Sequence, residues 1–142
     1  MLQTGNRIKV SVLVAARNEE NNIERCLRSL HELDFPKENI EMAEQLKNPL
    51  DSTAAVVASG KALYNTYCQH CHGETGAGDG KVAGMYKGVP NYSSDAYKAM
   101  NEGHIFHVIT HGKARMWPHG SQVNPEERWK IVHYVQTLQQ GA

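Results

Sequence analysis

The residues best suited to do chemistry lie together at Cys68-Gln69-His70-Cys71-His72. Two thiols three positions apart, followed at once by an imidazole, form the C-x-x-C-H pattern of covalent haem attachment. The thiols add to the two vinyl groups of one haem, and the histidine that follows is carried beneath the ring, where it can bind the iron. The pattern therefore predicts one covalent haem c, with Cys68 and Cys71 as its anchors and His72 as the proximal iron ligand.

Two other uses of a C-x-x-C pair fit this sequence poorly. A thioredoxin-like redox pair is expected in a βαβ context and does not require the histidine that follows here. A zinc site would need two more ligands at short spacing, and the sequence offers no second C-x-x-C or H-x-x-x-H pair on a matching hairpin. With three cysteines in all, the chain is not a disulfide scaffold either.

An iron bound in this way needs a sixth ligand, and a thioether sulfur in that position raises the reduction potential. Met116 is the predicted distal ligand, because it lies in an irregular segment well downstream of the motif. Met85 follows the motif too closely to wrap over the opposite haem face. Met100 falls in a predicted helix over residues 94–101 and is expected in the core.

Helical patterns flank the motif on both sides. Asp51-Ser52-Thr53 can cap a helix that leads into it, and Gly60 allows the close approach of another helix. Asn124 can cap a last helix, in which Pro125 suits the first position and two glutamates favour the positive end. Both helices carry apolar residues at helical spacing. These are Val57, Leu63, Tyr64 and Tyr67 in the first helix, and Trp129, Val132, Val135 and Leu138 in the last.

Histidine is the unusual residue type of the composition, with eight in the chain and seven of them between His70 and His133. His104, His107 and His111 recur at spacings of three and four, as metal ligands on one helix face would. The apolar residues between them form the buried face of that helix, however. We therefore predict these three histidines at polar or rim positions and no second metal site.

The motif, the helix before it and the glycine-rich loop after it together resemble class I monohaem cytochromes c, over residues 52–140. The resemblance implies a mainly α class I cytochrome c fold around one covalent haem, with a later methionine on the iron. It also implies that the first and last helices cross, with Gly60 against Trp129 or Val132.

One departure from the family pattern concerns the distal ligand. Family members usually carry the ligating methionine in an irregular loop, often with a proline directly after it, whereas Trp117 follows Met116 here. This departure, with His111 and His119 nearby, leaves bis-histidine ligation open. A haem protein with an open sixth position, for gas binding or peroxidatic chemistry, is the alternative function.

A narrower resemblance concerns residues 103–112 and 127–135. Their patterns Gly-x-Ile-Phe-x-Val-Ile and Glu-Arg-Trp-x-x-Val-x-Tyr-Val are similar to those of the monohaem cytochrome subunit of bacterial alternative complex III, and to domains that serve haem-copper oxidases. This implies a one-electron carrier, not an enzyme in its own right. Its partners would be a quinol-oxidising membrane complex and a terminal haem-copper oxidase, and its place the periplasm, attached to the cytoplasmic membrane through the complex.

Residues 1–41 differ in composition from the rest of the chain. The alternating segment 8–14, the following Arg17-Asn18-Glu19-Glu20 and Asp34-Phe35-Pro36 resemble the opening of family 2 glycosyltransferases. No Asp-x-Asp motif is present, and one strand with one helix cannot form a nucleotide-sugar site. We predict a short strand–helix appendage at 1–41, a linker at 42–51 and a monohaem cytochrome c domain at 52–142. A glycosyltransferase fragment is a third functional hypothesis.

The overall charge and hydropathy exclude several partners. Lys plus Arg and Asp plus Glu are equal at 15 each, so the formal net charge is zero, whereas nucleic acid and anionic membrane surfaces attract a basic excess. No apolar run is long enough to cross a bilayer, so we expect no direct membrane span. Residues 1–16 also lack the extended apolar region of a signal peptide, although covalent haem attachment takes place outside the cytoplasmic membrane.

Overall fold

Residues 40–141, the part of the chain that the computed structural model describes, form helices and no β-strand. The elements are α2 (Ile40–Ala43), α3 (Ala54–Tyr67), α4 (Gln69–His72), the 3₁₀-helix η1 (Ala83–Met85), α5 (Glu102–His111) and α6 (Pro125–Gln139). The predicted mainly α fold class is thereby confirmed. The predicted strand–helix appendage lies outside the described residues, except that residues 40 and 41 begin α2. Within the described part, no helix has both the length and the apolar character of a membrane span.

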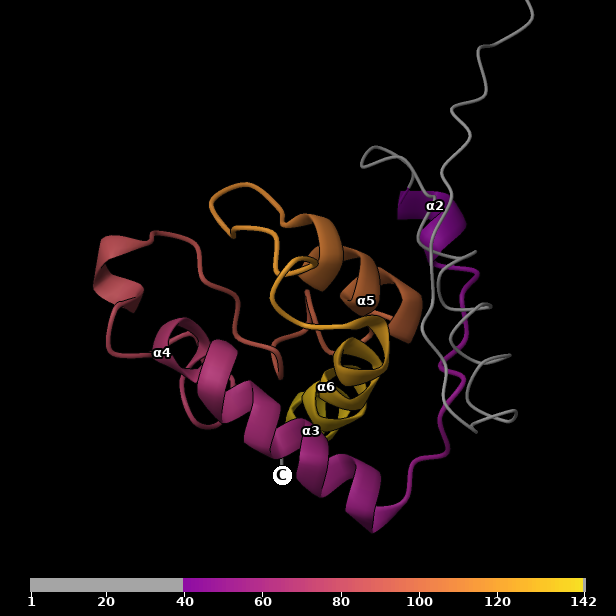
Figure 1. Ribbon diagram of the computed structural model, residues 1–142. Helices are drawn as coiled ribbons and strands as arrows, with labels where there is room; N and C mark the ends of the chain where they lie inside the picture. The colour runs from indigo at the N-terminus through magenta and orange to yellow at the C-terminus, as the bar shows by residue number, and fades with distance from the viewer. Residues whose placement is uncertain (1–39, 142) are drawn as a thin grey trace, which may run out of the picture.

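The centre of the fold is the crossing of α3 and α6, which Figure 1 shows with α5 beside α6. A Cβ atom placed on Gly60 would collide with the backbone carbonyl oxygen of Lys130, so the two helices approach as closely as their backbones allow. The predicted close approach at Gly60 is confirmed, and the atoms nearest to the added Cβ belong to the backbone of Lys130 and Ile131, the residues between Trp129 and Val132. Next to it, Tyr64 meets Tyr134 edge to face at 5.2 Å.

Both long helices begin where their sequences predict. The Thr53 side chain accepts a hydrogen bond from the Val56 backbone N–H at 3.3 Å, at the start of α3. Asn124 caps α6 in a complete capping box, in which its side chain accepts from the Glu127 N–H and the Glu127 carboxylate accepts from the Asn124 N–H. These caps satisfy backbone donors that a helix start otherwise leaves free.

Helix α5 lies between α6 and α2 and is buried on two sides. On the α6 side, Phe106 stacks on Trp129 with ring centroids 4.0 Å apart. On the same helix, His107 is only 5 % exposed. The prediction of a polar or rim position is therefore wrong for His107, because a helix with a partner on each side buries more than one apolar stripe. His104 and His111 are partly exposed, as predicted.

The segment that leads from α2 to α3 is packed against the helices, although residues 42–51 have the composition of a linker. Ala43 is fully buried against α5. The Asn48 side chain donates to the Trp129 carbonyl oxygen at 2.9 Å, and His133 Nε2 donates to the Leu50 carbonyl oxygen at 2.8 Å. This segment therefore fastens α2 to both α5 and α6.

The predicted helix over residues 94–101 is wrong, because the structure has a series of turns there. Asn91 and Ser94 form local hydrogen bonds that compete with a helix: the Ser94 hydroxyl donates to the Asn91 carbonyl oxygen at 2.7 Å. The Gln139 side chain then binds the carbonyl oxygens of Tyr97 and Met100, at 2.8 and 3.0 Å. Met100 is partly buried and packs against the core, as predicted.

Candidate haem site

The haem-attachment motif occupies a single helical turn. Cys68 ends α3 and caps α4, and its carbonyl oxygen accepts the backbone N–H groups of both Cys71 and His72, at 3.1 and 3.0 Å. Cys68 and Cys71 are free thiols. The turn therefore fixes the two sulfurs and the imidazole relative to one another through backbone bonds alone, as attachment of one flat macrocycle requires.

His72 is buried, with 7 % of its surface exposed. Burial, together with the positive charges that His119 and His70 would carry, lowers the pKa of His72 to about 4. The imidazole is therefore neutral near pH 7 and keeps the lone pair that a metal ligand needs. Its Nδ1 is buried and has no hydrogen-bond partner. Buried polar atoms are nearly always paired, and Trp129 Nε1 in the core is a further exception. The unpaired Nδ1 therefore shows only that no protein group competes for this nitrogen.

Tyr92 covers the His72 ring. The two rings stack at 5.0 Å between centroids, with 24° between their planes. The glycine-rich loop brings Tyr92 there, because the Tyr92 N–H donates to the Gly76 carbonyl oxygen at 2.9 Å. Gly76 has a φ of +74°, and a Cβ atom on it would collide with the Tyr92 ring. Sequence reasoning did not find Tyr92, because nothing in its local sequence marks a residue that the loop carries back onto the motif.

The environment of the thiols does not suit a reactive thiolate or a zinc site. Burial, and then the neighbouring Cys71, raise the pKa of Cys68 to about 12, and burial raises the pKa of Cys71 as well. A redox pair or a zinc ligand set would need lowered thiol pKa values. In the part of the chain that the structure describes, no three His, Cys, Asp or Glu side chains are grouped so that they could hold a metal ion.

Met116 lies in a tight turn after α5. Lys113 and Met116 exchange backbone hydrogen bonds, with N–O distances of 3.1 and 2.9 Å, and the Met116 side chain is half-buried. The other downstream methionine outside the core, Met85, is 73 % exposed on η1. Met116 therefore remains the predicted distal ligand.

His119 is the second candidate on the distal side. Its Nδ1 is buried without a partner, and burial lowers the pKa of His119 despite a backbone hydrogen bond to Trp117 that acts in the opposite direction. A positive charge on His119 would also lower the pKa of His72, so the two imidazoles lie near each other. His111, by contrast, lies against the ring of His107 at 4.7 Å. Two thiols, a neutral buried imidazole and a thioether or imidazole donor fit a haem c.

Comparison with known proteins agrees with this geometry. Residues 55–135, more than half of the chain, match the family described as cytochrome c oxidase, cbb3-type, subunit III. The fold is similar to that of a chain in the Kuenenia stuttgartiensis reducing HAO-like protein complex Kustc0457/Kustc0458, with a TM-score of 0.58 and 24 % identity over 67 % of this chain. The match covers 48 % of that chain, so this protein spans about half of its length. No curated protein matches the chain.

Proposed function

The chain belongs to the cytochrome c family described as cbb3-type cytochrome c oxidase subunit III, and from this premise we propose that it carries single electrons on one haem held by Cys68, Cys71, His72 and Met116. Family membership makes it a class I c-type cytochrome, an electron-transfer protein with a covalently bound c-type haem and its iron. When bound, the haem supplies the one-electron couple. The residues of this chain attach the haem, supply its ligands and exclude water from one face.

The observation that carries the proposal is the single turn of α4, in which both thiols and a neutral, buried imidazole are fixed by one carbonyl oxygen. The thiols form the two thioether bonds, and His72 supplies the proximal ligand. Tyr92 holds the plane of the His72 ring by stacking. Met116 supplies the distal thioether, which favours the ferrous state over the ferric state and so raises the potential.

The attachment is tested by removing the thiols. In Cys68→Ala the haem should be held by one thioether, and in Cys68→Ala with Cys71→Ala covalent attachment should be lost. The measurement is a pyridine-haemochrome spectrum together with haem retention after acid-acetone extraction of the denatured protein. Haem that stays on the double variant after extraction contradicts the assignment.

The alternative with an open sixth position is tested by carbon monoxide. A six-coordinate ferrous haem with Met116 in place should ignore the gas. Rapid carbon monoxide binding by the wild-type ferrous protein would favour the gas-binding or peroxidatic function instead. A ferric spectrum of bis-histidine type would instead assign the distal position to a histidine. His119 is then the first candidate, because its Nδ1 is buried and has no hydrogen-bond partner.

We propose a respiratory complex as the partner, passing electrons from quinol towards a terminal haem-copper oxidase. Three likenesses support it: the patterns shared with alternative complex III, the oxidase named in the family description, and the redox complex in the name of the similar structure. A periplasmic location, attached to the membrane through the complex, follows from covalent haem attachment outside the cytoplasmic membrane. The test is quinol-dependent reduction of the purified holoprotein by the purified complex. No reduction above the rate without the complex contradicts the assignment.

A further inference from the structure

The loop that carries Met116 has little packing of its own. Four of the five residues between 113 and 117 are exposed, and Trp117 is 78 % exposed. Ala114 has a φ of +52°, a conformation that side chains disfavour. The two ends of the loop are fixed by α5, because Gly112 N–H donates to the Val108 carbonyl oxygen at 2.8 Å and His119 N–H to that of Ile109 at 2.9 Å. Between these fixed ends the tip is largely exposed, so a side-chain contact from the tip to the helices bears on its position.

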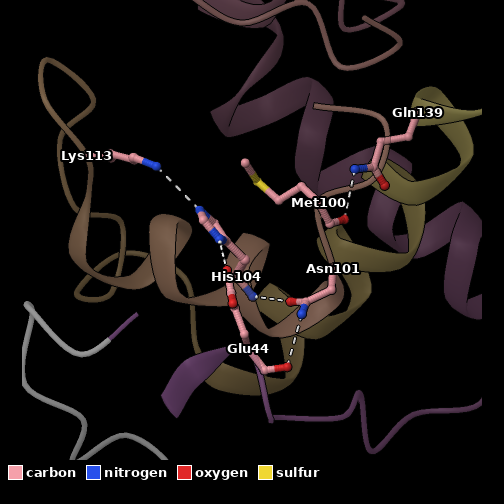
Figure 2. A network of polar contacts seen from close by, with 6 residues as sticks. All are labelled: Glu44, Met100, Asn101, His104, Lys113 and Gln139. Carbon is pink, nitrogen blue, oxygen red and sulfur yellow. Dashed lines mark hydrogen bonds and ion pairs between the residues drawn. The ribbon is translucent and has the colours of Figure 1, made fainter. Parts of the chain in front are cut away.

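Lys113 makes that contact. Figure 2 shows its side chain directed at His104 of α5, with 3.4 Å between Lys113 Nζ and His104 Nε2, and the other ring nitrogen, Nδ1, 2.8 Å from Glu44 Oε1. A lysine ammonium can only donate, so His104 Nε2 accepts and Nδ1 carries the proton. His104 Nδ1–H then donates to the Glu44 carboxylate. The three side chains form one directed chain from α2 to the loop.

Glu44 is itself held in place by backbone contacts. Its carbonyl oxygen accepts the Asn101 side-chain amide at 3.0 Å, and the Asn101 side-chain oxygen accepts the His104 N–H at 2.9 Å (Figure 2). The same asparagine therefore caps α5 and fixes the residue that follows α2. Glu44 and His104 enter the chain of contacts from positions that the fold already determines.

We propose that Glu44 and His104 are positioning residues for the distal iron ligand, and that they act through Lys113. The backbone of Lys113 exchanges two hydrogen bonds with that of Met116, so the tip moves as a unit and its release carries Met116 away from the haem face. The proposal rests on the proposed function, since it requires Met116 on the iron. The segment after α2 would then help to hold the distal ligand indirectly, through His104 and Lys113.

The experiment measures how easily an outside ligand displaces Met116. Imidazole is titrated into ferric holoprotein, and the far-red charge-transfer band of thioether-ligated ferric haem is followed. Lys113→Met and Glu44→Gln should each raise the apparent imidazole affinity about three- to tenfold, as expected for one charge-assisted hydrogen bond that is partly exposed. Lys113→Arg, which restores a donor at the loop tip, should stay close to wild type.

The matched control is Lys47→Met. It removes a positive charge and an ion pair between the same two segments, Lys47 to Glu102 at 3.7 Å, without touching the loop. Its imidazole affinity should equal that of wild type. Because Glu44 acts only through His104 and Lys113, adding Glu44→Gln to Lys113→Met should change nothing further.

The outcomes separate this proposal from the proposed function. If wild type shows the charge-transfer band and Met116→Ala loses it, while Lys113→Met and Glu44→Gln bind imidazole as wild type does, the positioning role is wrong and the ligand assignment stands. An equal effect of Lys47→Met also overturns the positioning role, since charge alone would then explain the change. If wild type lacks the band, the assignment of Met116 fails and this proposal fails with it.

Discussion

At the scale of residues, the proximal side of the haem site is built from short-range contacts and the distal side from long-range ones. Cys68, Cys71 and His72 are held by one carbonyl oxygen within five residues of sequence. Met116 depends on a turn whose tip is fastened to α5 and, through Glu44, to the segment after α2. Changes to the distal ligand should therefore alter the potential and leave attachment intact.

Met116→His tests this directly. The variant should keep a six-coordinate haem and lower the reduction potential by on the order of 100 mV or more, because imidazole stabilises ferric iron more than a thioether does and axial ligands set haem potentials over about 0.8 V. The measurement is a redox titration of the holoprotein. Met85→Leu is the control, since this side chain is 73 % exposed and should leave the potential unchanged. An unchanged potential in Met116→His, with a drop in Met85→Leu or Met100→Leu, would move the ligand elsewhere.

At the scale of elements, the crossing of α3 and α6 depends on the missing side chain of Gly60. Gly60→Ala should lower the free energy of unfolding by roughly 1–3 kcal/mol, because the added methyl group meets the rigid Lys130 carbonyl and the helices must separate. Gly84→Ala is the matched control, since nothing lies within 4 Å of its Cβ position; its stability should stay within about 0.5 kcal/mol of wild type. Denaturant unfolding of the two holoproteins measures both. Equal stability of the two variants would show that the crossing tolerates a side chain.

The same elements show what the sequence could predict and what it could not. The caps at Thr53 and Asn124 and the turn of C-x-x-C-H are local, because each rests on contacts within a few residues. The stack of Tyr92 on His72 depends on a loop that returns over about twenty residues, so no local pattern marks it. His107 is buried on a helix, α5, that packs against both α6 and α2, and no local pattern marks the second of these contacts. Prediction therefore failed on a helix with two partners.

At the scale of the whole molecule, α2 packs beside α5, and the segment after it runs from there to the start of α3 (Figure 1). We propose that residues 1–41 are nevertheless separate in origin from the haem domain 52–142, on the change of composition near residue 41. Deleting residues 1–39 should leave the haem spectrum, potential and stability unchanged, because the contacts of Ala43, Glu44, Asn48 and Leu50 survive. Thermal unfolding and redox titration measure this, and a large loss of stability would show that residues 1–39 pack on the cytochrome.

Deleting residues 1–50 is the companion experiment. It removes the buried Ala43 and four long-range hydrogen bonds: Asn48 to Trp129, Leu50 to His133, and Glu44 to both Asn101 and His104. At about 1 kcal/mol for each bond, the free energy of unfolding should fall by roughly 4 kcal/mol. Stability equal to that of the 1–39 deletion would mean that this segment contributes nothing to the fold and behaves as a linker.

The charge of the whole haem domain predicts how it meets its partner. Together with the segment 42–51 that leads into it, the domain carries nine basic and eight acidic side chains, and two ionised haem propionates would bring the net charge to about −1. Near Met116 only Lys113 and Arg115 are basic, and Lys113 is engaged with His104. Long-range steering needs a strong field of one sign, so electron transfer to the complex should depend only weakly on salt.

The measurement is the transfer rate with the purified complex from low to physiological ionic strength. A fall of more than about tenfold would favour a freely diffusing carrier and contradict a permanent subunit, because a protein already held in its complex has no encounter for salt to screen.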